Sequence, residues 1–222
     1  MPAYTVDQAA PGVVHITLTE PERRNPIGPA VAAEMESRFD GGEAGAVVLS
    51  ATGPVFSAGG DLALGVDGLA ALSDRLYDLY ERILVAPTVL VVAADGLAMG
   101  AGAMFVLCAD IRVAGPRFGW RAAVPERAMA GGMWLLPGQV GRGRALDAFL
   151  TGRTLDAEEA HQWGIVDHVA DDPVAEALRL AEAAAAAPAE FRARVKGVVA
   201  AAARTREAWA TEKAGFRPPG RP

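Results

Sequence analysis

Two glycine-rich segments, each placed directly after an apolar run, constrain the fold of this chain most strongly. Residues 56–62 (FSAGGDL) follow the run at 47–49, and residues 96–102 (GLAMGAG) follow the run at 89–92. An apolar, β-branched run that ends in glycines indicates a buried strand leading into a turn. Two such turns side by side can direct two backbone N–H groups at one point, a geometry that stabilises an oxyanion as it develops on a carbonyl.

The rest of the chain alternates between strand-like and helix-like patterns. The patterns predict strands over residues 13–18, 46–50, 88–93 and 111–113. They predict a helix around residues 69–83 that stops before Pro87, and another that starts at 155–160. The other predicted helices cover residues 29–39, 103–109, 173–187 and 191–213. This alternation favours an α/β fold with helices packed on mostly parallel strands.

Composition excludes several classes of function. The net charge of −6 argues against a nucleic-acid partner, because binding to a polyanion needs a basic face. We expect no membrane segment, since no uninterrupted apolar stretch reaches the roughly 18 residues that a spanning helix needs. The single cysteine, Cys108, lies in an apolar stretch, so a buried inert thiol and a reducing cytoplasm are expected. No His and carboxylate cluster has metal-ligand spacing, and we expect no metal.

Three longer motifs carry a family resemblance. The phrases FSAGGDL, APTVLVVAADGLAMGAGAMFVLCADIRVA and VGRGRALDAFLTGRTLDAEEAHQWGIVDHV resemble the enoyl-CoA hydratase/isomerase family, also called the crotonase family, over about residues 12–170. The resemblance implies a crotonase-like spiral of repeated ββα units over residues 1–145, followed by a shortened helical region over 146–222. It also implies an acyl-CoA thioester as the binding partner and a homotrimer or hexamer as the assembly.

The resemblance also assigns candidate site residues. It places the two oxyanion donors at the N–H groups of Gly60 and Ala101, with a helix that starts near Gly102 adding its positive end. Coenzyme A belongs to the substrate, so no separate cofactor is expected. The residues expected to contact coenzyme A are Arg23, Arg24, Ser57, Ala58, Asp61 and Leu62.

The acid/base groups depart from the family pattern. Met104 and Ala122 occupy the positions at which hydratases carry glutamates, and Glu126 is the carboxylate that could return to the pocket. Hydration needs a positioned acid and base, whereas moving a double bond needs one group that takes and returns a proton. Two hypotheses follow: an isomerase-like or atypical hydratase that uses Glu126, and an acyl-CoA-binding or accessory protein. In the second, Glu126 is a surface carboxylate paired with Arg121 or Arg127.

The remaining polar candidates are interpreted as structural. We expect Asp61 to bond backbone N–H groups within its turn as well as to lie near coenzyme A. Asp110 closes the buried helix and is expected to act as a cap or as one partner of an ion pair. His15 is expected to make a cross-strand contact, and His161 and His168 to belong to a helix-turn-strand scaffold.

Overall fold

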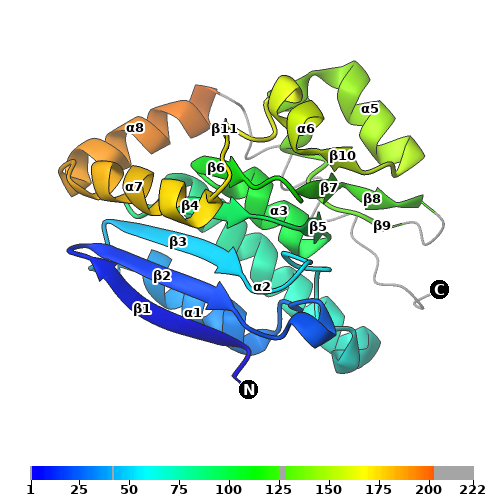
Figure 1. The fold of residues 1–222 in the computed structure, drawn as a ribbon, viewed down its shortest axis with the longest axis horizontal. Coiled ribbons are helices and arrows are strands. Elements are labelled where there is room, and N and C mark those ends of the chain that lie inside the picture. Colours follow the sequence, from blue (N-terminus) through cyan, green and yellow to red (C-terminus); the bar gives the residue numbers. More distant parts are fainter. Residues whose placement is uncertain (1, 42, 126–128, 203–222) are drawn as a thin grey trace.

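The computed structural model describes residues 2–41, 43–125 and 129–202. Its centre is a six-stranded sheet in the order β1-β2-β3-β4-β6-β11, parallel throughout except for the antiparallel pair β1 and β2 (Figure 1). The strands of this sheet are β1 (Tyr4–Ala10), β2 (Val13–Leu18), β3 (Ala46–Ala51), β4 (Val89–Ala94), β6 (Ile111–Ala114) and β11 (His168–Val169).

Two smaller sheets lie beside the large one. A three-stranded sheet has the order β10-β7-β5, and β8 pairs with β9 in an antiparallel hairpin. Their bounds are β5 (Leu97–Met99), β7 (Gly119–Arg121), β8 (Ala123–Val124), β9 (Met129–Ala130) and β10 (Leu155–Asp156). The short strand β5 matters most, because it leads from the large sheet into the second glycine-rich turn.

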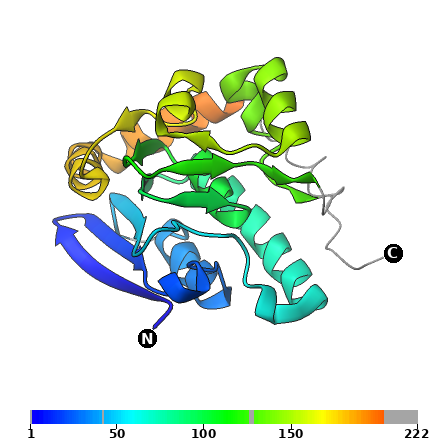
Figure 2. The same cartoon turned by 45° about the vertical axis from the view of Figure 1, so that its right-hand side comes forward.

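Helices cover both faces of the large sheet. They are α1 (Pro29–Phe39), α2 (Gly65–Val85), α3 (Ala101–Cys108), α4 (Leu136–Val140), α5 (Arg142–Thr151), α6 (Ala157–Trp163), α7 (Pro173–Ala185) and α8 (Ala189–Ala202), with 3-10 turns η1 (Pro21–Arg23) and η2 (Leu62–Leu64). Helix α7 packs on one face against β2, β3, β4 and β6, and α1 lies on the opposite face (Figures 1 and 2). Among the described helices, none combines the length and the apolar character needed to cross a bilayer.

Alternate side chains of each central strand enter two separate cores. On β3, Val47 and Leu49 join the core shared with α1, α2 and α3, whereas Val48 joins the smaller core under α7. Both sets are fully buried because successive side chains of a strand point to opposite faces and both faces are covered. Double coverage explains why the central strands read as continuous apolar runs rather than alternating ones.

The predicted alternation of strands and helices is confirmed, with shifts at several ends. The buried helix predicted over 103–109 begins two residues earlier, at Ala101. The predicted helix start at 155–160 needs correction, because Leu155 and Asp156 form β10 and α6 begins at Ala157. Asp156 caps that helix by accepting a hydrogen bond from the N–H of Glu159 at 2.9 Å. Of the helix predicted over 191–213, α8 accounts for the part as far as Ala202, and the remainder lies outside the described residues.

A largely buried ion pair fastens α8 to the sheet, with the Asp110 side chain 20% exposed. Lys196 is 8% exposed, and its ammonium lies 2.7 Å from a carboxylate oxygen of Asp110 and donates to the carbonyl of Thr88 at 2.8 Å. The same Asp110 oxygen accepts the N–H of Leu90 at 2.8 Å, at the start of β4. Burial raises the pKa of the Asp110 carboxyl and lowers the pKa of the Lys196 amine. The expected structural role of Asp110 is confirmed.

Substitution of Lys196 by methionine is expected to lower the free energy of unfolding by about 3–5 kcal/mol, because it leaves the Asp110 carboxylate buried without its cation. The loss of unfolding free energy in Lys196→Met should become smaller as the pH is lowered. The pKa of Asp110 is raised in the folded state, so at low pH this carboxyl takes up a proton and no longer needs the Lys196 cation. Denaturant titration across a range of pH measures both effects. Arg179→Met, which removes an exposed pair with Glu176, is the control and should change stability little. A deficit that grows at low pH would contradict this assignment.

Candidate active site

Within residues 57–61 of the first glycine-rich turn, one backbone N–H has no acceptor among the described residues. Among the described residues, the N–H of Gly60 donates to no protein atom, and Gly60 is partly exposed. The other four N–H groups of residues 57–61 all donate: Ser57 to Leu97 O (3.2 Å), Ala58 to Arg24 O (3.0 Å), Gly59 to Ser57 Oγ (3.2 Å) and Asp61 to Ile27 O (3.0 Å). The turn therefore offers one unused donor to a ligand.

The free N–H follows from a parallel bridge between Ile27 and Gly60. Ile27 donates its N–H to the carbonyl of Gly59 at 2.8 Å and accepts from the N–H of Asp61 at 3.0 Å. In a parallel pairing the two bonds of one residue go to the neighbours of the residue opposite, whose own N–H then faces away. The N–H of Gly60 is thus directed away from Ile27.

The second glycine-rich turn leaves a donor at the start of a helix. Gly100 has φ 50° and ψ −123°, a conformation that side chains rarely allow, and α3 begins at the next residue. The first N–H groups of a helix have no acceptor within the helix, and among the described residues that of Ala101 has none elsewhere. The dipole of α3 adds roughly half a positive charge at the same end.

The two turns are in direct contact. A Cβ built on Gly59, whose φ is +107°, lies 3.4 Å from the backbone nitrogen of Ala101 and 3.4 Å from the Cα of Gly100. A second parallel bridge joins the segments, since Met99 donates its N–H to the carbonyl of Ser57 at 2.9 Å. The predicted proximity of the two turns is therefore confirmed.

The two positions at which the resemblance places hydratase carboxylates are buried and apolar. Met104 and Ala122 are each 3% exposed. A Cβ built on Gly131 lies 3.4 Å from the sulfur of Met104, and the N–H of Gly131 donates to the carbonyl of Ala122 at 3.2 Å. Gly131 thus packs between the two positions. Neither of them contributes a proton-transfer group.

The predicted acid/base residue, Glu126, lies outside the described residues. Its access to the two turns stays a prediction. Among the described histidines, His15 makes the expected cross-strand contact, with Nε2 2.7 Å from the Oγ of Ser50. Burial lowers the pKa of His15. His161 contacts the carbonyl of Val166 through Nδ1 at 3.1 Å, in keeping with its expected scaffold role.

The residues predicted to contact coenzyme A surround the first turn. The guanidinium of Arg23 is 2.9 Å from both carboxylate oxygens of Asp61 and 2.9 Å from Glu20. Asp61 also accepts the N–H of Ala63 at 3.1 Å, which confirms its structural role in the turn. Contact of Arg23 with a phosphate would compete with these two carboxylates, so that contact stays a prediction.

The other predicted coenzyme A contacts differ in accessibility. The carbonyl of Arg24 accepts the N–H of Ala58, while both residues are exposed. Leu62 is 64% exposed at the start of η2. Ser57 is fully buried, and its hydroxyl accepts the N–H of Gly59, so this side chain holds the turn. Only its backbone is suited to a ligand contact.

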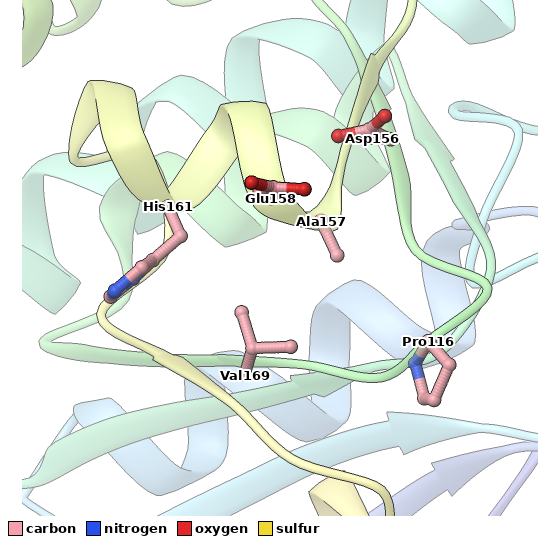
Figure 3. Close-up of a pocket in the computed structure, with 6 residues that line it drawn as sticks. All are labelled: Pro116, Asp156, Ala157, Glu158, His161 and Val169. Carbon is pink, nitrogen blue, oxygen red and sulfur yellow. The ribbon is translucent and has the colours of Figure 1, made fainter.

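A separate surface hollow lies at the start of α6 (Figure 3), with a volume of about 450 Å³. Its lining residues are Pro116, Asp156, Ala157, Glu158, His161 and Val169. None of the residues predicted for the active site lines it. Within the described ranges, no group of three or more His, Cys, Asp or Glu residues is arranged to hold a metal ion.

Comparison with known proteins agrees with the fold and the motifs. The family model for enoyl-CoA hydratase/isomerase matches residues 8–215. A probable enoyl-CoA hydratase of Mycobacterium tuberculosis is 37% identical over 191 residues, which cover 80% of this chain and 74% of that protein. The 1,2-epoxyphenylacetyl-CoA isomerase of Escherichia coli is 32% identical over 187 residues, covering 78% and 71%.

Solved structures agree as well. A Bacillus anthracis enoyl-CoA hydratase superposes with a TM-score of 0.82 at 25% identity, covering 96% of this chain and 90% of that one. A Pseudoalteromonas atlantica enoyl-CoA hydratase/isomerase gives 0.83 at 28% identity, covering 96% and 88%. The predicted crotonase-like α/β fold is confirmed. By its matched motifs, its sequence identity and its fold, the chain belongs to the enoyl-CoA hydratase/isomerase family.

Proposed function

We propose that this chain acts on an acyl-CoA thioester whose carbonyl oxygen accepts hydrogen bonds from the N–H groups of Gly60 and Ala101. The observation that carries the proposal is the N–H of Gly60, which has no acceptor in the described part of the chain although the other four N–H groups of residues 57–61 are bonded. It lies directly beside the first N–H of α3, which has no described acceptor either. Two such donors stabilise the negative charge that appears on the oxygen when the thioester becomes an enolate.

We propose isomerisation of an enoyl-CoA as the reaction, with Glu126 as its single acid/base group. The carboxylate removes a proton from the carbon next to the thioester, and the electron pair moves into the enolate. The same proton then returns to a carbon two positions further along, so the double bond moves and the atoms balance. The buried Met104 and Ala122 support this choice over ordinary hydration, which needs two proton-transfer groups.

The second candidate function is binding of an acyl-CoA without turnover. It is favoured by the same two apolar positions, and it differs from the first in having no acid/base residue at all. A cytoplasmic location and a homotrimer or hexamer also remain proposals. Exposed apolar side chains along α8 support an assembly: Phe191, Val195, Val198 and Val199.

Glu126→Gln is expected to lower kcat for a 3-enoyl-CoA by about 10²–10⁴-fold while its affinity for the thioester stays unchanged, because the amide cannot shuttle the proton. Absorbance assays with a 3-enoyl-CoA and with crotonyl-CoA, beside a calorimetric titration, measure both quantities. Glu190→Gln, at an exposed position of α8, is the control. Binding without turnover by the unmodified protein would favour the second candidate. Full activity in Glu126→Gln would remove Glu126 from the mechanism.

A further inference from the structure

The loop from Glu20 to Ile27 supports the whole first turn. Three backbone hydrogen bonds join the two segments: Ala58 N–H to Arg24 O (3.0 Å), Ile27 N–H to Gly59 O (2.8 Å) and Asp61 N–H to Ile27 O (3.0 Å). These bonds flank Gly60 on both sides. The position of its N–H therefore depends on how firmly this loop is held.

Asn25 holds the loop from its buried side, in addition to the ion pair between Arg23 and Asp61 at the surface. Its side chain is 1% exposed, and all of its hydrogen bonds go to the backbone. Its Oδ1 accepts the N–H of Glu20 at 2.9 Å, and its Nδ2 donates to the carbonyls of Thr52 and Val55 at 2.8 and 2.7 Å. Residues 52–55 lead directly into the first turn. One amide group thus joins the loop to the segment that delivers Gly60.

The backbone at this point is also unusual. Within the described residues, Arg24 and Asn25 are the non-glycine residues with positive φ, at 63° and 50°. Asparagine tolerates this region better than most residues, but the conformation still costs energy and persists only where the surroundings enforce it. Here the three side-chain bonds of Asn25 enforce it, and the strained pair directs the Arg24 carbonyl to Ala58.

We propose that Asn25 is a positioning residue for the oxyanion donor Gly60. The inference rests on the proposed function, since it assigns to Asn25 the placement of a group that acts there. Asn25 fixes the two segments that support Gly60, namely the loop at 20–27 and the approach at 52–55. Loss of its amide loosens both segments, although the backbone bonds and the Arg23–Asp61 pair remain, and the N–H of Gly60 moves relative to that of Ala101.

Asn25→Gly is the first test, because glycine adopts the same φ without strain and removes only the side chain. It is expected to lower kcat by about 10–100-fold, the cost of misplacing a reacting group by a fraction of an ångström to an ångström. The affinity for free coenzyme A should fall by a smaller factor than kcat, because Arg23 and Arg24 lie in the loosened loop but binding of coenzyme A does not depend on the spacing between the two donors. Binding of acetoacetyl-CoA gives a spectroscopic readout, because the absorbance of its enolate in the near ultraviolet measures how much of the bound ligand is ionised. The bound enolate fraction should be high in the unmodified protein and reduced in Asn25→Gly.

Asn25→Asp keeps the inference testable if the glycine variant does not fold. As a carboxylate, the new side chain places an oxygen against the carbonyls of Thr52 and Val55. Once protonated, it can donate to one of them. Its kcat relative to the unmodified protein should therefore rise as the pH is lowered. Thr52→Val, which loses only a hydroxyl bond to the Leu18 carbonyl at 3.2 Å, is the matched control and should show no such pH effect.

The possible results distinguish the positioning role of Asn25 from the proposed function itself. Folded Asn25 variants with normal kcat and a normal enolate fraction would overturn the positioning role and leave the proposed function standing. If the unmodified protein binds acetoacetyl-CoA without enriching its enolate, the oxyanion assignment fails, and the role of Asn25 fails with it. A reduced enolate fraction, with a smaller loss of coenzyme A affinity, supports both.

Discussion

Replacing Ala101 by proline is expected to lower kcat by about 10²–10³-fold, because proline has no N–H and one of the two proposed oxyanion donors is lost. The fold should survive. Ala101 is the first residue of α3, where proline is well tolerated, and its N–H has no acceptor among the described residues. Gly100, with φ 50° and ψ −123°, has the mirror image of the extended conformation that the residue before a proline favours, and glycine without a Cβ can adopt it.

Ala101→Gly is the matched control, since it changes the same position and keeps the N–H. It should retain turnover, and circular dichroism should show that both variants are folded. Steady-state kinetics on the substrate accepted by the unmodified protein then isolates the contribution of the N–H. A folded Ala101→Pro variant with normal kcat would show that the charge on the thioester oxygen is stabilised elsewhere.

Adding a single methyl group at Gly102 is expected to reduce both stability and turnover. A Cβ at this position lies 2.7 Å from the Cβ and from the carbonyl oxygen of Ser57, so the backbone must shift. Such overpacking costs about 1–3 kcal/mol of unfolding free energy. Ser57 accepts bonds from both turns, from Met99 N–H at its carbonyl and from Gly59 N–H at its hydroxyl. Its displacement should therefore separate the donors and lower kcat by about 10²-fold.

Gly143→Ala provides the contrast for Gly102→Ala. Gly143 lies in α5, where a built Cβ meets no atom within 4 Å and the backbone is not left-handed. Alanine there should raise the unfolding free energy by about 0.5–1 kcal/mol, because it favours the helix. Thermal melting and kinetics of the two variants, measured side by side, test whether the effect at Gly102 is local to the turns. Equal effects at both positions would refute the close-contact argument.

Much of the fold could be predicted because the large sheet is covered on both faces. Apolar runs such as 46–50 and 88–93 indicate buried parallel strands, and the spacing of apolar residues over 69–83 indicates a helix with one buried face. Strand β1 cannot be recognised in the sequence, because its interior residues are exposed and it pairs at the edge of the sheet. The division at residue 145 stays a prediction.

The short strands cannot be predicted from the sequence, for a different reason. Strands β5, β7 and β10 have two or three residues each, too few for an alternating pattern to appear. Their pairing is set by contacts between distant parts of the chain, such as Leu155 with Trp120. Sequence periodicity reports on local burial and carries no information of this kind.

The site shows the same division between local and distant signals. The two glycine-rich turns are visible in the sequence, since each follows its own strand, and the family resemblance gives the positions of the two proposed donors. The support around them is not visible. Arg23 meets Asp61 across 38 positions, and Asn25 bonds carbonyls 27 and 30 positions away. A carbonyl is present at every residue, so no side-chain pattern could identify these acceptors.

The parallel bridge with Ile27 leaves the backbone N–H of Gly60 as the group proposed to act, so replacing side chains does not test it directly. Both proposed charge-stabilising groups are main-chain atoms, so an alanine scan passes over them. Position 101 is already alanine. At position 60, alanine keeps the N–H, and the experiment would measure the effect of a methyl group placed 3.3 Å from the Leu69 side chain. Amide-to-ester exchange, which swaps one N–H for an oxygen and keeps every side chain, is the chemical edit that reaches these groups.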